Sequence, residues 1–125
     1  MTIALLLSFL VSFLPSSTMG SLTNEQVELI HYAYTKSIEE EVNPTKIIKL
    51  VNCESQWNTE AFNFETESKK KGITKFSSCG LFQHNDKRCA DKNSELYDGF
   101  YSIDLGFEKL DKQGASAWKF CSKRV

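Results

Sequence analysis

One carboxylate, Glu54, lies where the apolar face of a predicted helix ends. It follows Ile47, Leu50 and Val51 by seven, four and three residues, spacings that place side chains on one face of a helix. Burial and the negative end of the helix dipole both disfavour ionisation, so we expect a raised pKa for Glu54. A carboxylic acid that stays protonated near neutral pH can protonate a glycosidic oxygen. If the helix ends one turn earlier, or if Glu54 turns to solvent or pairs with a Lys, it is an ordinary charge instead.

The beginning of the chain is typical of an export signal. Residues 1–20 contain no Asp, Glu, Lys or Arg, and the run from 3 to 14 is apolar apart from two serines. Such a run is shorter than the roughly 20 residues that span a bilayer, and small residues follow it. We therefore expect a secretory signal peptide over residues 1–20, cleaved near Gly20, and one domain over residues 21–125. Because no Lys or Arg precedes the apolar run, an uncleaved membrane anchor is the alternative.

The four cysteines that follow this signal are Cys53, Cys79, Cys89 and Cys121. An even number of cysteines behind an export signal predicts disulfides formed in an oxidising compartment. We expect two bridges in a secreted protein, extracellular or periplasmic. Four cysteines allow three pairings, and their spacing alone does not choose among them. No CxxC or HxxxH spacing is present, and His31 and His84 are isolated, so we expect no metal and no cofactor.

Composition and charge exclude some partners. The chain has 125 residues and a formal net charge of -1, so it lacks the positive field that holds nucleic acid or an anionic membrane. We expect one domain, a monomer, and no stable insertion into a membrane after signal cleavage.

The helices that must position Glu54 can be predicted from caps and periodicity. Thr23 and Gln26 have the form of a capping box and open a helix over 24–41. Asn43 and Pro44 cap a second helix, whose buried face ends with Glu54 and which ends near 55–57. A last long helix is expected to begin with Ser102 as its cap and to end before Gly114, and a final turn carries Trp118 and Cys121.

Between the second and last helices the helical period is lost. Residues 58–78 alternate in part and contain a charged stretch, which indicates a small hairpin or a long loop. A short apolar segment follows over 79–83, and we expect the polar residues 84–93 to form a surface loop. The fold class is therefore α+β and mainly helical, in a single domain.

Two short motifs accompany Glu54. The first consists of Glu54, Ser55, Trp57, Asn58 and Ala61, and the second of Gly80, Leu81, Phe82, Gln83 and Asn85. Together and in this order they resemble the signature motifs of the soluble lytic transglycosylase and goose-type lysozyme group of the lysozyme-like superfamily. The likeness extends more faintly to Leu110, and the Trp-x-x-Cys ending is similar to that of small secreted members. It implies a lysozyme-like fold with a small β-hairpin or loop insertion.

The resemblance also implies an activity. Its members cleave the β-1,4 bond between N-acetylmuramic acid and N-acetylglucosamine in the glycan strands of peptidoglycan, and Glu54 would be the catalytic acid and then the base. We favour a lytic transglycosylase over a muramidase that hydrolyses the same bond. The alternatives are a catalytically inactive peptidoglycan-binding module and a disulfide-stapled helical interaction protein. A two-carboxylate mechanism would need a second acid about 5 to 9 Å away, and spacing selects none of Glu65, Glu67 and Asp86.

The family pattern assigns further residues to substrate binding. Gln83 would reach the sugar from the wall facing Glu54, Gly80 would let the backbone approach the sugar, and Ser55 would hold the site or touch the substrate. The family's Ala-Tyr-Asn segment is absent, so Tyr97 and Tyr101 are the candidates for its cleft tyrosine. Other side chains have two interpretations each. Trp57 would either stack on a sugar or pack in the core, and His84 would either transfer a proton or only pack. The lysines near the hairpin would either attract anionic wall polymers or form a solvated hairpin tip. These lysines are Lys69, Lys70, Lys71 and Lys75.

Once the motifs are placed, one cysteine pairing is favoured. Bridges between Cys53 and Cys121 and between Cys79 and Cys89 would staple both sides of the cleft, whereas the other pairings would crosslink the two motif segments and close the groove. The longer of these bridges would contribute roughly 3 to 4 kcal/mol in the chain-entropy description.

Overall fold

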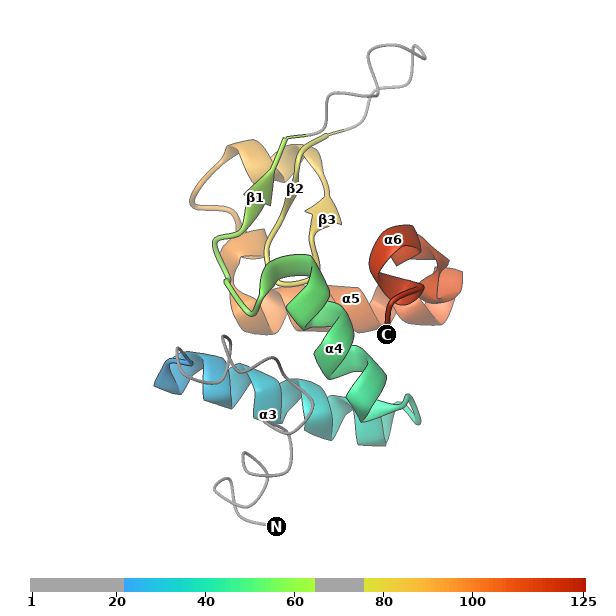
Figure 1. Cartoon of the computed structure of the whole chain (residues 1–125). Coiled ribbons are helices and arrows are strands. Elements are labelled where there is room, and N and C mark those ends of the chain that lie inside the picture. Colours follow the sequence, from blue (N-terminus) through green and yellow to red (C-terminus); the bar gives the residue numbers. More distant parts are fainter. Residues whose placement is uncertain (1–21, 65–75) are drawn as a thin grey trace.

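The computed structural model describes residues 22–64 and 76–125. The expected signal peptide, Glu65, Glu67 and the lysine cluster lie outside these residues. The described chain forms three long helices, α3 (Asn24–Glu39), α4 (Pro44–Ser55) and α5 (Gly99–Gln113), and a short α6 (Lys119–Ser122). Figure 1 shows a small sheet at one end of the molecule and α3 at the other, with α4 and α5 between them. A mainly helical α+β fold is thus confirmed, and no helix in the described ranges is long and apolar enough to cross a membrane.

The caps of the first two helices are those predicted. Thr23 Oγ1 accepts from the Gln26 backbone N–H at 3.1 Å, and Gln26 Oε1 accepts from the Thr23 N–H at 2.8 Å. Asn43 Oδ1 accepts from the Thr45 N–H at 3.0 Å, with Pro44 at the first position of α4. Helix α3 ends at Glu39, two residues earlier than expected, because Glu41 takes a left-handed backbone conformation (φ 57°) and turns the chain toward α4.

The expected start of the last helix is wrong. Asp98 caps α5, because its Oδ1 accepts from the N–H groups of Phe100 at 2.9 Å and Tyr101 at 3.1 Å. Ser102 lies in the first turn of α5, fully buried, and its hydroxyl accepts from the Phe82 N–H at 3.3 Å. The predicted end is confirmed, since Gly114 follows Gln113 with φ 68°.

The sheet consists of β1 (Phe62–Asn63), β2 (Ser78–Cys79) and β3 (His84–Asn85), paired antiparallel in the order β1-β2-β3. The pairing of Phe62 with Cys79 confirms a hairpin between the first two strands. The surface loop expected over 84–93 is wrong at its beginning, because His84 pairs with Cys79 and is only 1% exposed. Beyond β3, single turns of 3-10 helix cover 87–90 and 95–97.

The main core lies between α3, α4, α5 and the C-terminal turn. Ile47, Ile48, Leu50 and Val51 of α4 are all buried in it, as predicted. Phe82 packs near Phe107 and Trp118, with ring centroids 6.4 Å and 5.5 Å away. The Trp118 indole Nε1–H donates to the Phe82 carbonyl at 2.7 Å and so fixes the C-terminal turn on the second motif.

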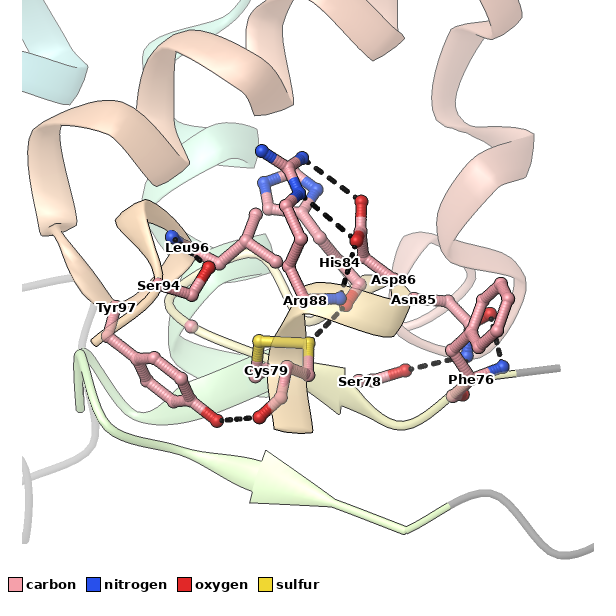
Figure 2. The surroundings of a disulfide bond; sticks show 12 residues. Phe76, Ser78, Cys79, His84, Asn85, Asp86, Arg88, Ser94, Leu96 and Tyr97 are labelled. Carbon is pink, nitrogen blue, oxygen red and sulfur yellow. Dashed lines mark hydrogen bonds and ion pairs between the residues drawn. A yellow bond between two sulfur atoms is a disulfide. The ribbon is translucent and has the colours of Figure 1, made fainter. Parts of the chain in front are cut away.

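Both favoured disulfides are present. Cys53 of α4 is bonded to Cys121 of α6, and Cys79 of β2 to Cys89 of the following 3-10 turn. The first bridge ties the residue beside Glu54 to the C-terminal helix. The second lies beside the second motif, and Figure 2 shows it next to Tyr97 and the His84 segment.

Candidate active site

A cleft of about 970 Å³ lies between the end of α4, the sheet and the C-terminal helices. Its lining is mixed, with polar side chains from the sheet and α5 and an apolar edge from the C-terminal turn. The lining residues are Glu54, Asn63, Ser78, Gln83, Asn85, Lys109, Gln113, Ser116, Ala117, Trp118, Lys119 and Phe120. The cleft therefore contains residues of both motifs, Glu54 from the first and Gln83 and Asn85 from the second.

Glu54 is half-buried at the penultimate position of α4. Burial raises its pKa to about 7, and no neighbouring charge contributes to the shift. Within the described ranges its carboxyl makes no hydrogen bond and no ion pair, so the ordinary alternative of a Glu–Lys pair is not observed there. Glu54 is thus an acid whose protonated form is populated near neutral pH and which faces a solvent-accessible cleft.

Gln83 is fixed in place on the wall formed by the sheet. Its backbone is left-handed, with φ 52°. Its side-chain Nε2 donates to the carbonyls of Ala61 at 3.2 Å and Gly80 at 3.0 Å. Its Oε1 accepts from Asn63 Nδ2 at 2.7 Å, which brings a second amide group to the cleft. The Gln83 side chain is therefore preorganised, and its Oε1 has one further lone pair available.

Gly80 and Ser55 line no part of this cleft. Gly80 is buried with φ 80°, and a Cβ there would lie 2.4 Å from the Leu96 carbonyl oxygen, so packing against the protein's own backbone requires glycine. Ser55 is buried, and its hydroxyl donates to the Val51 carbonyl at 3.1 Å, the usual i to i−4 bond of a helical serine. Neither residue contacts the cleft, and the substrate-binding roles predicted for them stay predictions.

The two candidate tyrosines lie in a second, smaller cluster around the Cys79–Cys89 bridge. The Tyr97 hydroxyl donates to the Cys89 carbonyl at 2.6 Å, and the Tyr101 hydroxyl accepts from Arg88 Nη1 at 3.0 Å. Neither tyrosine lines the cleft. Trp57 is fully buried in the main core, which supports its packing interpretation over sugar stacking.

Asp86 is engaged elsewhere. Its carboxylate accepts from Arg88 Nε at 3.1 Å and Nη2 at 3.0 Å, and Figure 2 shows this pair above the disulfide. The Arg88 hydrogen bonds lower the pKa of Asp86, and the residue is not part of the cleft lining. Within residues 22–64 and 76–125, Glu54 is the acidic residue of the cleft.

The cleft also contains residues that the sequence analysis missed. Lys109 on α5 is half-buried, and its Nζ lies 2.9 Å from His84 Nδ1. Phe120 on α6 is 65% exposed at the cleft edge, with the Arg124 guanidinium 4.3 Å from its ring centroid. An exposed aromatic ring of this kind can stack on a sugar face. The Trp-x-x-Cys ending was the one sequence signal near Phe120, and no signal marked Lys109.

Comparison with known proteins identifies no counterpart of this site. The chain matches no protein-family model, no curated protein and no solved structure. In the described part of the chain, no group of three or more His, Cys, Asp and Glu side chains is placed to hold a metal ion.

Proposed function

We propose that this protein is a secreted glycosidase that cleaves the β-1,4 bond between N-acetylmuramic acid and N-acetylglucosamine in peptidoglycan, with Glu54 as its single catalytic group. The observation that carries the proposal is a half-buried carboxyl with a pKa of about 7 in a cleft of about 970 Å³, a volume in the range of small-molecule sites. The two disulfides fit a protein of an oxidising compartment.

The reaction needs one proton donor that becomes an acceptor. Protonated Glu54 gives its proton to the glycosidic oxygen as the C1–O bond breaks, and positive charge develops at C1 of the muramyl sugar. The resulting Glu54 carboxylate then accepts a proton from the 6-hydroxyl of that sugar, whose oxygen bonds to C1 and forms a 1,6-anhydro ring. If water reaches C1 first, its oxygen bonds to C1, the same carboxylate accepts its proton, and the product is a sugar with a reducing end. We favour the route to the 1,6-anhydro product because, among the residues that the structure describes, the cleft contains one acidic side chain rather than two.

Polar and apolar parts of the lining have separate tasks in this proposal. The preorganised amides of Gln83 and Asn63 offer hydrogen bonds to sugar hydroxyl and acetamido groups. The exposed ring of Phe120 offers an apolar face on the opposite, C-terminal edge of the cleft. A peptidoglycan-binding module without activity is the second candidate, favoured by the position of Tyr97 and Tyr101 outside the cleft.

The deciding experiment measures the loss of turbidity of purified cell walls. Glu54→Gln keeps the size of the side chain but cannot donate and then accept a proton, so we expect clearing to fall by about 100-fold or more. Glu60→Gln is the matched control, because Glu60 is exposed and does not line the cleft. Clearing by Glu54→Gln at the wild-type rate would contradict the proposal, and wall binding without clearing by the wild type would favour the inactive module.

Product analysis separates the two reactions. Ends with 1,6-anhydromuramic acid indicate transglycosylation, and reducing ends indicate hydrolysis. We expect the anhydro product, and its absence from a digest that clears the wall would identify a muramidase.

A further inference from the structure

We propose that Lys109, held by His84 in the wall of the cleft, binds a carboxylate carried by the muramyl part of the substrate. This inference rests on the proposed function and deepens it, because it assigns a group that distinguishes an acidic wall glycan from a neutral polymer of N-acetylglucosamine. Its basis is the fixed position of Lys109 and the charge of the cleft.

The position of Lys109 is set by hydrogen bonds that join α5 to His84 of β3. His84 Nε2 lies 2.9 Å from the Ser102 carbonyl, which can only accept, so this nitrogen carries the proton. Nδ1 of the neutral ring is then an acceptor, and the Lys109 ammonium donates to it at 2.9 Å. A lysine anchored in this way loses less side-chain entropy when it binds a ligand than a freely rotating one.

The Lys109 ammonium has donors left for a ligand. One of its three N–H groups is used on His84, and within the described residues Lys109 forms no ion pair with an acid. The nearby Asp86 is bound by Arg88 instead. Burial lowers the pKa of Lys109, and the charge of Asp86 offsets this only in part, so a carboxylate arriving in the cleft would supply the direct ion-pair partner that the ammonium lacks among the described residues.

The sign of the cleft supports an acidic ligand. Among residues 22–64 and 76–125, the charged lining residues are Glu54, Lys109 and Lys119, so this part of the lining carries a net positive charge whether Glu54 is protonated or ionised. The whole chain has a formal net charge of -1, so this local excess of cations is not a property of the molecule at large. A charged cleft concentrates ligands of opposite sign.

The test measures binding to the full chain carrying Glu54→Gln, so that no ligand is cleaved. The probes are a tetrasaccharide of alternating N-acetylglucosamine and N-acetylmuramic acid, the same tetrasaccharide with its lactyl carboxyls converted to amides, and the same tetrasaccharide bearing stem peptides. We expect the acid form to bind about tenfold more tightly than the amide form, as for a charge-assisted hydrogen bond, with a preference that falls as salt is added. Preference for the peptide-bearing form over the amide form would assign the carboxylate to the peptide rather than to the lactyl group.

Adding Lys109→Gln should remove the preference, and Lys109→Arg, which keeps the cation, should restore part of it. Lys112→Gln is the matched control, because Lys112 lies on the same helix but pairs with Glu108 at 2.8 Å outside the cleft. Thermal unfolding of each variant verifies that it is folded. An unchanged preference in Lys109→Gln overturns this inference alone, even if the wild type clears walls. Preference without any wall cleavage by the wild type overturns the proposed function and leaves the site standing. Absence of binding to every probe overturns this inference, and it overturns the proposed function as well only if the wild type does not clear walls.

Discussion

Glu54 and His84 are both held toward their neutral forms by burial, with different consequences. Burial raises the pKa of the Glu54 carboxyl to about 7, which leaves it a proton donor at neutral pH. Burial first, and the charge of Lys109 second, lower the pKa of His84 to about 4. A histidine with this pKa does not take up a proton near neutrality, so its task in the structure is to accept from Lys109 rather than to transfer protons.

The raised pKa of Glu54 predicts how activity depends on pH. The donor form is lost as pH rises through about 7, so kcat/KM for wall clearing should fall by about tenfold per pH unit above that value. Initial clearing rates at constant ionic strength measure the profile. A descending limb centred near the ordinary glutamate pKa of about 4.5 would contradict a buried acid at this position.

Folding stability supplies a control that does not depend on catalysis. Between the unfolded pKa of about 4.5 and the folded pKa of about 7, the folded state binds more protons than the unfolded state. The free energy of unfolding must therefore decrease as pH rises through this window. Glu54→Gln removes the part of the free energy of unfolding that depends on the titration of Glu54. The temperature midpoint of unfolding of this variant should therefore exceed that of the wild type above pH 7, and the two midpoints should converge toward pH 4.5. Parallel curves for the two proteins would show that Glu54 titrates alike in both states.

Among the elements, α6 depends most on a covalent link. The Cys53–Cys121 bridge joins residues 68 apart in sequence, whereas Cys79–Cys89 joins residues 10 apart. In the chain-entropy description, replacing both cysteines by Ala should cost about 4 kcal/mol for the first bridge and about 3 kcal/mol for the second. Denaturant unfolding of the two double variants compares these losses.

The first double variant should also lose most of its wall clearing, because α6 carries Lys119 and Phe120 of the cleft. The second should retain more activity, since its bridge lies among residues that mostly do not line the cleft, Ser78 and Asn85 being the exceptions. Equal activity in both double variants would show that the C-terminal wall of the cleft holds its place without the bridge.

Local signals predicted the elements that local interactions determine. The capping box of α3, the Asn43–Pro44 start of α4 and the Gly114 end of α5 each depend on a few adjacent residues. The start of α5 was predicted wrongly because Asp98 and Ser102 can both cap a helix, and the choice depends on Phe82, 20 residues from Ser102, which uses the Ser102 hydroxyl.

In the candidate site, too, residues marked by local patterns could be predicted, and residues placed by distant contacts could not. Glu54 followed from helix periodicity, and Gln83 from its motif. Strand β3 has two residues, too few for an alternating pattern, and the burial of His84 depends on partners 18 and 25 residues away. Lys109 and Phe120 line the cleft only because of how α5 and α6 are arranged in space, with α6 packed against α4, and no spacing in the sequence reports that arrangement.

In the molecule as a whole, two bridges and two clusters of buried side chains must hold a cleft open. The main core unites α3, α4, α5 and the C-terminal turn, and the cleft lies along its border with the sheet. Each disulfide fastens one side of this border, so the walls that carry Glu54 and Gln83 are stapled separately and not to each other. Separate stapling preorganises both walls while leaving the groove accessible to a polymer.

This architecture and the expected export signal predict the mass of the protein recovered from the medium or periplasm. The non-reduced protein should have the mass of the chain beginning near Ser21, less four hydrogens for the two bridges, and reduction should restore those four hydrogens. Intact-mass spectrometry before and after reduction measures both quantities on one sample. A mass that still includes residues 1–20 would show that the segment is not cleaved, and an unchanged mass on reduction would contradict the stapled cleft on which the proposed catalytic geometry depends.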